Sequence, residues 1–447
     1  MDATHGRRGG SGVVKRLLLG TLTMLCLAPG VAAAGWAEAN GGVRTFDAMV
    51  ELFRNEYWNP VHVDWNAWAD EHRERVLGAG SRDAFDAALR RMVRALDDDH
   101  SSWSGLPDRL DLPPLDDGPG HLPLGPPRLG VQFAFVAGRG LVVERVFPAT
   151  PAEAAGLQRG DVVVAVDGAP LGERGGLADA NSLLLDALEA GAVRLDVERR
   201  RTSLTVDVVA APVAFSRAAA APFSVLLDPS TGYLALPTFN ADGVGVQAHE
   251  HLRALAEGGA VNLVLDLRGN LGGRLVELGL VLGAFLDGDW AEAIAHDRVA
   301  WRARYERDER GGVARLIADD GAVLAEARID DPMRWRGAVV VIVAAENASA
   351  GEIAALALQD HGRARVVGES TSGNVEAIRG FSLLDGSRVF IAVANLRGAH
   401  GLEYDAGVIP EILVRSTVLD LARGVDPAVA AARRLLGALP FTPDRHF

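Results

Sequence analysis

Hydrophobic positions recur at helical spacing early in the chain, where residues 35–112 predict a helical region. In FDAMVELFRNEYW (46–58), apolar residues fall three and four positions apart, on one face of a helix. SRDAFDAALRRMVRAL (81–96) repeats the pattern, and Ser81 stands where a residue that caps a helix N-terminus is expected. The following stretch, residues 104–128, is rich in Pro, Gly and Asp and predicts a linker.

Beyond the linker, the pattern changes to the alternation that is typical of strands. LGVQFAFV (129–136) and LVVERV (141–146) have this period, and a short helix is expected to begin near Pro151. VRLDVERRRTSLTVDVVAA (193–211) predicts a closing hairpin. These elements together indicate a second, strand-rich domain over residues 129–213.

Longer apolar runs alternate with helical segments over residues 214–447. Helices are expected near 246–257 and 350–361, and DPAVAAARRLLGAL predicts a C-terminal helix capped by Asp426. Strands are expected in GYLALPTF, VNLVLDLRG, AVVVIVAA, ARVVG and SRVFIAVANLR. Because buried strands appear as continuous apolar runs, this alternation predicts an α/β core, and the whole chain an α/β multidomain protein.

Composition narrows the function classes. The chain has 447 residues, 49% of them hydrophobic, and a formal net charge of −14. This acidic balance argues against a nucleic-acid partner, which favours a basic surface. No metal motif or phosphate-binding loop stands out, so neither a metal nor a cofactor is expected.

The N-terminal stretch has the features of a secretory signal peptide over residues 1–34. Basic residues precede an apolar run that ends in small residues of the A-x-A type near Ala34. A periplasmic or secreted location is therefore expected, with membrane attachment only if this segment is retained. The single cysteine, Cys26, and the single lysine, Lys15, both lie in it, so the mature chain contains neither a thiol nor a lysine base.

Ser349 stands between the apolar run VVVIVAA and the helical segment AGEIAALALQDHG. At a helix N-terminus, free N–H groups favour negative charge, so a nucleophilic serine there would have its oxyanion stabilised by the N–H of Ala350. The alternative is a serine that only caps the helix. In LDLRGNLGG, the paired glycines Gly272 and Gly273 permit close backbone approach and offer a second N–H. A plain strand-to-helix turn is the alternative there.

The segment PATPAEAAGLQRGDVVVAVDGAPL resembles a PDZ domain, and the resemblance covers about eighty residues. Such domains bind peptide C-termini by adding a strand to a sheet edge, with the carboxylate on a glycine-containing loop. The resemblance places that loop at Leu129, Gly130 and Val131. A PDZ fold without a peptide-binding role stays open.

Three motifs, LVLDLRGNLGG, NASAGEIAALALQDHGRARVVGESTSGN and GVIPEI, resemble the C-terminal processing, or tail-specific, serine peptidases in their order. The resemblance implies a crotonase/ClpP-like α/β core, Ser349 as nucleophile and oxyanion donors at Ala350 and at Gly272 or Gly273. The best-known branch uses a lysine base twenty-five residues after the serine. That position is Asn374 here, so a serine–lysine dyad is impossible.

A second branch, which resembles the tricorn core protease, uses histidine and glutamate with the serine. On this resemblance His100, in ALDDDHSSW, is the expected base, since histidine exchanges protons near neutral pH. Glu403 is the expected orienting carboxylate, with Asp405 as the alternative and His400 as a rival base. His100 as an ordinary surface or hydrogen-bonding histidine stays open.

The sequence therefore predicts a serine endopeptidase that cleaves unstructured or C-terminal segments of polypeptides through an acyl-enzyme on Ser349. The missing lysine motivates an alternative, an inactive scaffold whose PDZ domain captures peptide C-termini. A hydrolase of non-peptide esters or amides also stays open. The oligomeric state is not determined by the sequence.

Overall fold

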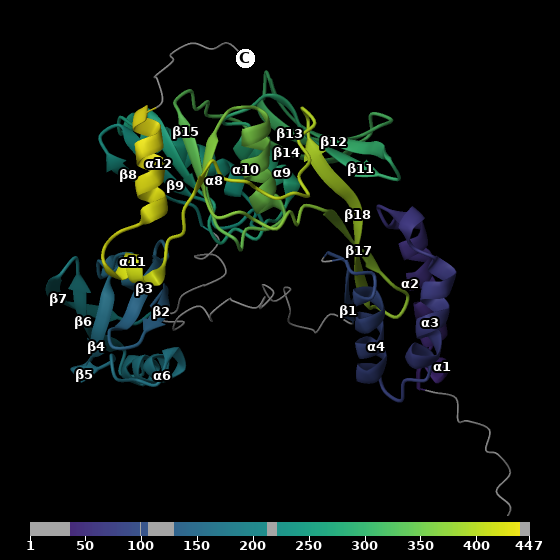
Figure 1. The fold of residues 1–447 in the computed structure, drawn as a ribbon, viewed down its shortest axis with the longest axis horizontal. Helices are drawn as coiled ribbons and strands as arrows, with labels where there is room; N and C mark the ends of the chain where they lie inside the picture. The colour runs from purple at the N-terminus through teal and green to yellow at the C-terminus, as the bar shows by residue number, and fades with distance from the viewer. Residues whose placement is uncertain (1–35, 99, 106–128, 212–220, 439–447) are drawn as a thin grey trace, which may run out of the picture.

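A computed structural model describes residues 36–98, 100–105, 129–211 and 221–438 of the chain (Figure 1). The predicted signal peptide and most of the predicted linker lie outside the described residues. Within the described part of the chain, no helix combines the length and the apolar character needed to cross a membrane.

The N-terminal region is a helical layer, as predicted. Ser81 caps α4 (Arg82–Arg94) by accepting a hydrogen bond from the Ala84 N–H, at 3.2 Å. The buried faces of the helices pack on Val389 and Ile391 of β18 (Arg388–Gly398). The layer consists of α1 (Trp36–Ala39), α2 (Gly42–Glu56), a 3-10 turn η1 (Pro60–His62), α3 (Trp65–Leu77) and α4 (Arg82–Arg94).

The region predicted as helical also contains a strand, β1 (Ser102–Gly105), which pairs antiparallel with β18. Its side chains alternate between exposed and buried, and Trp103 is buried between α4 and β18. This edge pairing is a tertiary contact, so the helical pattern upstream does not reveal it. It joins the N-terminal layer directly to the sheet of the C-terminal region.

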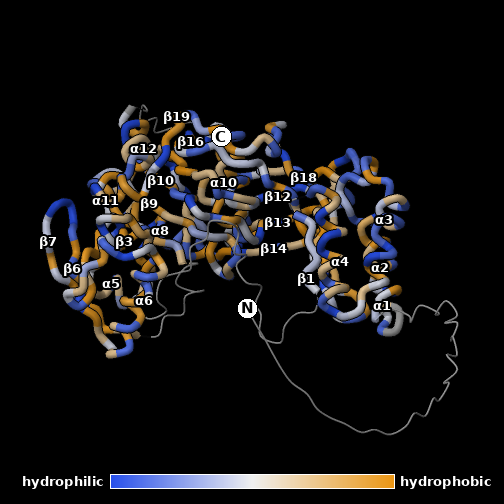
Figure 2. Tube along the Cα trace, turned by 60° about the horizontal axis from the view of Figure 1, so that its bottom comes forward, coloured by the Kyte–Doolittle hydropathy of each residue, from blue (hydrophilic) through white to orange (hydrophobic). Residues whose placement is uncertain are grey.

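The second domain is a six-stranded antiparallel sheet with two helices. The strand order is β2-β3-β4-β6-β7, with β5 beside β4, so β2 lies at an open edge. The predicted 193–211 hairpin is confirmed, and its turn residues Arg200 and Arg201 have φ of 47° and 71°; the tip is hydrophilic in Figure 2. The elements are β2 (Val131–Val136), β3 (Gly140–Val146), α5 (Pro151–Ala154), β4 (Val162–Val166), β5 (Ala169–Pro170), α6 (Leu177–Leu188), β6 (Ala192–Arg199) and β7 (Thr202–Val209).

The C-terminal region contains a six-stranded sheet in the order β19-β16-β15-β10-β9-β8, parallel except for β8. Helices α8, α9 and α10 cover one face, and α12 packs on the other through Ala428 and Ala432. Both faces are therefore buried, which explains the apolar runs. The elements are β8 (Phe223–Asp228), β9 (Thr231–Ala235), α8 (Val244–Glu257), β10 (Asn262–Asp266), α9 (Leu275–Leu282), β15 (Val339–Val343), α10 (Ala350–Asp360), β16 (Arg365–Gly368), β19 (Ile412–Leu413) and α12 (Pro427–Ala438).

A second sheet follows the order β1-β18-β11-β12-β13-β14, with β17 beside β18. The sequence pattern did not predict the antiparallel strands between α9 and β15. Tyr305 and Ala314 on these strands pack into the same core as the parallel sheet. The added strands are β11 (Gly288–Ala295), β12 (Arg298–Asp308), β13 (Gly311–Ala318), β14 (Val323–Ile329) and β17 (Ala377–Ser382). The predicted α/β multidomain organisation is thus confirmed.

A short helix, α11 (Val418–Ala422), connects the C-terminal region to the second domain by packing against Val142 and Val162. Next to it, Asp426 caps α12 as predicted, accepting from the Ala428 N–H at 3.2 Å. The same carboxylate forms ion pairs with Arg268 of the core and Arg159 of the second domain. Burial would raise the pKa of Asp426, but these two guanidinium groups hold it well below its usual range. Asp426 therefore joins the two domains.

Candidate active site

Ser349 stands at the junction of β15 and α10, as the sequence indicated. It occupies the N-cap position of α10 with φ 51°, in a region that non-glycine residues rarely adopt. Its side chain makes no capping hydrogen bond. Among the described residues the Ser349 hydroxyl has no hydrogen-bond partner, so the backbone presents it without using it as a cap. A strained serine between a strand and a helix is a geometry known from other hydrolases.

A glycine loop after β10 lies directly against Ser349. Gly272 has φ +101°, and a Cβ atom there would lie 2.7 Å from the Ser349 Cβ. Gly273 has φ +139°, and its Cβ would lie 2.2 Å from the Asn240 backbone nitrogen. Real Cβ atoms do not approach so closely, so both positions require glycine.

The N–H groups of this loop differ in their partners. The Gly272 N–H donates to Oδ1 of Asn270 at 2.8 Å. Within the described residues, the N–H groups of Gly273 and Ala350 have no hydrogen-bond partner. Free backbone donors beside a serine are the groups that an oxyanion would need.

Two buried asparagines connect the serine loop to the glycine loop. Asn347 accepts a hydrogen bond from the Ala344 N–H at 2.7 Å and donates to the Asn270 carbonyl at 3.1 Å. Asn270 in turn donates to the Leu236 carbonyl at 2.9 Å. These side chains set the position of the glycines relative to Ser349, because each is buried and its amide is hydrogen-bonded.

The segment that contains Asn374 passes alongside Ser349. The Ser349 N–H donates to the Asn374 carbonyl at 2.6 Å. The fully buried Glu352 carboxylate accepts from the N–H groups of Gly373 and Asn374 at 2.8 and 2.9 Å. Three hydrogen bonds therefore attach this segment to the first turn of α10.

His100 is brought to the same segment by the N-terminal layer. The backbone N–H of His100 donates to Oδ1 of Asp98 at 2.8 Å. The hydroxyl of the neighbouring Ser101 accepts from the Ala392 N–H of β18 at 3.0 Å. The His100 side chain is buried, and its Nδ1 lies 2.7 Å from Oε2 of Glu376. This is an ion-pair distance without the alignment of a regular hydrogen bond. Nε2 has no partner among the described residues.

Burial would raise the pKa of Glu376, but the nearby His100 ring and backbone N–H groups outweigh this effect and hold the pKa below its usual value. Glu376 was not identified from the sequence. The signal was nonetheless present, because Asn374 and Glu376 flank the fully buried Val375 and so share the opposite face of an extended segment. His100 and Ser349 therefore approach the same short segment, although no hydrogen bond joins them.

A polar cavity of about 190 Å³ adjoins this segment. Burial, with the negative charges of Asp98 and Glu376, raises the pKa of Tyr57 in its wall to about 12. The lining residues are Tyr57, Trp58, Asp97, Asp98, Ser372, Gly373, Asn374 and Glu376. The cavity therefore lies between the N-terminal layer and the segment that contacts both Ser349 and His100.

The other residues named from the sequence lie elsewhere. Glu403 is exposed and forms an isolated backbone bridge with Arg397, and Asp405 is also exposed. His400 contacts Asp360, at the opposite end of α10 from Ser349. His249 of α8 is fully buried and accepts a hydrogen bond from the Met333 N–H. Among the described residues, only Asp360, His361 and His400 bring three possible metal ligands together.

The predicted peptide-carboxylate loop lies at the start of the edge strand β2. The Leu129 and Gly130 carbonyls accept hydrogen bonds from the N–H groups of Ala152 and Phe147 at 2.8 and 3.0 Å. Gly130 has φ +76°, and a Cβ there would lie 2.2 Å from the Thr150 Cβ. An open edge strand preceded by a glycine loop is the arrangement that strand addition requires.

Comparisons with known proteins agree with these features. Residues 230–414 match the model of Peptidase family S41, and residues 127–209 match that of a PDZ domain. The chain also has the fold of a candidate S41 protease from Bacteroides fragilis, with a TM-score of 0.53, 17% identity and coverage of 88% of this chain and 98% of that chain.

Curated relatives carry related names. A carboxyl-terminal-processing protease of Synechocystis sp. is 30% identical over 291 residues, 62% of this chain and 60% of that protein. A chloroplastic C-terminal processing peptidase of Tetradesmus obliquus is 29% identical over 348 residues, 74% of this chain and 68% of that protein. The matches thus span 60% and 68% of the length of these two relatives. Residues 230–414 therefore carry a peptidase family S41 domain, and a PDZ domain precedes it.

Proposed function

We propose that this protein is a serine endopeptidase that cleaves unstructured or C-terminal segments of polypeptides through an acyl-enzyme on Ser349. The observation that carries the proposal is the placement of Ser349. Its backbone is strained and its side chain makes no capping hydrogen bond, and the adjoining N–H groups of Gly273 and Ala350 have no partner among the residues that the structure describes. The alternative, an inactive scaffold, has no need for a strained serine whose hydroxyl is left unused.

In the proposed reaction, the Ser349 oxygen attacks the carbonyl carbon of the scissile peptide while Nε2 of His100 takes its proton. The negative charge moves to the carbonyl oxygen, where the N–H groups of Ala350 and Gly273 stabilise it at the positive end of α10. The C–N bond then breaks, and His100 returns the proton to the leaving amine. Water repeats the sequence on the ester and regenerates Ser349.

Glu376 has the orienting role in this proposal that the sequence suggested for Glu403. Its carboxylate, 2.7 Å from Nδ1 of His100, would hold the ring and stabilise the imidazolium that forms. Nε2 has no partner among the described residues and is available to Ser349. A shift that brings Nε2 to the serine oxygen is required, as in other enzymes whose catalytic hydrogen bonds tighten only with substrate bound.

The test uses an unfolded protein substrate with an apolar C-terminus, together with a fluorophosphonate probe. Wild-type protein should cleave the substrate and label at Ser349, and Ser349→Ala should do neither. His100→Ala should lose most cleavage, whereas His62→Ala, at an exposed histidine outside the site, should not. If wild type neither labels nor cleaves, the scaffold alternative is correct. If His100→Ala retains the wild-type rate, His100 is not the base.

We further propose that the PDZ loop at Leu129, Gly130 and Val131 selects free peptide C-termini. Its support is the edge position of β2 and the glycine at the head of that strand. A substrate with an amidated C-terminus should be cleaved more slowly than the same substrate with a free carboxylate. Equal rates would contradict the role of the loop and leave the peptidase proposal intact.

The basic and apolar pattern of residues 1–34 also supports export to the periplasm or beyond. N-terminal sequencing of the protein from the extracytoplasmic fraction should give a start near Gly35. A protein that keeps Met1 and remains in the cytoplasm would contradict this proposal.

A further inference from the structure

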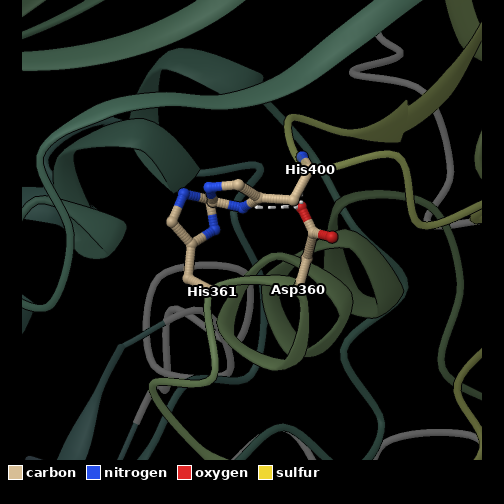
Figure 3. Close-up of side chains that lie close together, drawn as sticks. All are labelled: Asp360, His361 and His400. Carbon is tan, nitrogen blue, oxygen red and sulfur yellow. Dashed lines mark hydrogen bonds and ion pairs between the residues drawn. The ribbon is translucent and has the colours of Figure 1, made fainter.

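A cluster of three potential metal ligands lies at the C-terminal end of α10. Asp360 is the last residue of the helix, His361 caps it, and His400 follows β18 (Figure 3). Their donor atoms all lie within 4.8 Å of one another, and the two imidazole ring centres are 4.4 Å apart. The segments that carry them are distant in sequence, so the fold alone creates the cluster.

His361 is the most informative member, because both of its ring nitrogens face carbonyl oxygens. Nδ1 lies 2.9 Å from the Ala357 oxygen, and Nε2 lies 3.1 Å from the Asp289 oxygen. A neutral imidazole has a single N–H and can donate to only one of them. The other nitrogen then directs its lone pair towards an oxygen, which is favourable only if a proton or a metal ion stands between them. Donation from Nδ1 to a backbone carbonyl is also how metal-binding histidines are oriented.

Asp360 adds a nearly buried negative charge. Its side chain is only 4% exposed. Its Oδ2 accepts a hydrogen bond from the backbone N–H of His400 at 2.9 Å and lies 3.4 Å from the ring nitrogen Nδ1 of the same residue. Among the described residues, no arginine pairs with this carboxylate. A Cβ on Gly398 would lie 2.4 Å from Oδ2, so the backbone of β18 leaves room for it. A buried carboxylate at the carbonyl end of a helix favours a cation.

We propose that Asp360, His361 and His400 form a binding site for a divalent transition metal, with Zn²⁺ as the best match. Two imidazoles and one carboxylate are a common zinc set, and the fourth position would take water or the Asp289 carbonyl. Tetrahedral ligands around zinc lie roughly 3.4 Å apart, given metal–ligand bonds of about 2.1 Å. His400 is 60% exposed and can close the remaining distance.

The site would be structural or regulatory, because α10 separates it from Ser349. The helix has 11 residues and spans about 16 Å at 1.5 Å per residue. A bound metal would connect the end of α10 to the turn after β18 and to β11, through Asp289. It would hold the helix that presents Ser349 without taking part in the reaction there.

The test is a Zn²⁺ titration of tag-free, chelator-treated full-length protein, followed by calorimetry and by thermal unfolding. Wild type should bind one Zn²⁺ per chain and unfold at a higher temperature as Zn²⁺ is added. His400→Ala should bind at least about tenfold more weakly. His62→Ala, the matched exposed histidine, should bind as wild type does.

His361→Ala leaves two carbonyl groups without a partner, so its misfolding is a risk that His400→Ala avoids. Co²⁺ gives a second readout, because a tetrahedral site with nitrogen ligands produces visible absorption that His400→Ala should abolish. The proposal is overturned if wild type shows no saturable Zn²⁺ binding. It is equally overturned if His400→Ala binds as tightly as wild type.

Discussion

The two ends of helix α10 are held in different ways. At the N-terminal end, Ser349 and Glu352 are fastened to the Gly373–Asn374 backbone by hydrogen bonds, and Gly272 leaves no space for a side chain. At the C-terminal end, the His361 ring faces the Ala357 and Asp289 carbonyls, and the adjoining His400 is 60% exposed. Buried contacts in a close-packed site have few alternative arrangements, whereas an exposed side chain can move, so the N-terminal end should tolerate far less change.

The helix dipole gives the same two ends opposite preferences. The Ala350 N–H, which has no partner in the described part of the chain, favours a developing anion, whereas the carbonyl groups near His361 favour a cation. One helix would thus serve catalysis at one end and cation binding at the other. The following variants test this difference, beginning with the largest expected effect.

Glu376→Gln should have the largest effect on activity. A neutral amide cannot stabilise the imidazolium of His100, and we expect kcat/KM to fall roughly a thousandfold with the fold unchanged. Glu403→Gln, at an exposed carboxylate, should change kcat/KM less than about twofold. Both variants are measured on the same peptide. A larger loss in Glu403→Gln than in Glu376→Gln would show that Glu403 orients the histidine.

Gly272→Ala should be the next most severe change. Its methyl group would press on Ser349 from a backbone conformation that alanine rarely adopts, and we expect about a hundredfold loss of kcat/KM. Gly269→Ala is the matched control, since its φ is +73° but, apart from its chain neighbours, no described residue has an atom within 4 Å of the new methyl group. Equal losses in both variants would show that backbone strain, and not contact with Ser349, is responsible.

Glu352→Gln and Gln359→Ala together compare how much each end of α10 contributes to stability. An amide cannot accept both N–H groups as well as a carboxylate does, so we expect about 2–3 kcal/mol less free energy of unfolding. Gln359→Ala, near the other end, removes only an exposed 3.1 Å bond to the Ile409 carbonyl and should cost within about 0.5 kcal/mol. Urea denaturation of both variants measures the difference, and comparable losses would contradict the proposed asymmetry.

Acid should have the smallest effect at this site. The pKa of Glu376 is lowered in the folded state, so the pair with His100 contributes stability above the unfolded pKa of about 4.3. That contribution is lost as the pH falls further, through the lower pKa of the folded state. Melting temperatures of wild type and Glu376→Gln should differ at pH 7 and converge below about pH 4. If the difference in melting temperature stays constant between pH 7 and pH 4, the Glu376–His100 pair is not the group that titrates.

Much of the fold could be predicted because local patterns encode it. The continuous apolar run of β15 and the helix after Ser349 are confirmed, as is the cap at Asp426. The strands between α9 and β15 were missed, although their residues alternate in burial. Their pairing depends on a sheet whose other members, β1 and β18, come from opposite ends of the chain.

The candidate site also contains residues that could be predicted from the sequence and residues that could not. Ser349 and the paired glycines could be found from the sequence, because a strand, a small-residue turn and a helix follow one another directly. Glu376 was missed, since its contact with His100 joins the N-terminal layer to the C-terminal region. The two-residue spacing from Asn374 indicates the face on which Glu376 lies, but nothing local to Glu376 or His100 indicates that the two meet.

By itself, the sequence determined that no lysine follows Lys15, the strand-to-helix position of Ser349 and the order of the domains. These properties depend on residue type and on short spacings. Only the tertiary structure decided which carboxylate meets His100 and that Asp360, His361 and His400 converge. Those contacts depend on how separate elements pack, and packing is a property of the whole folded chain.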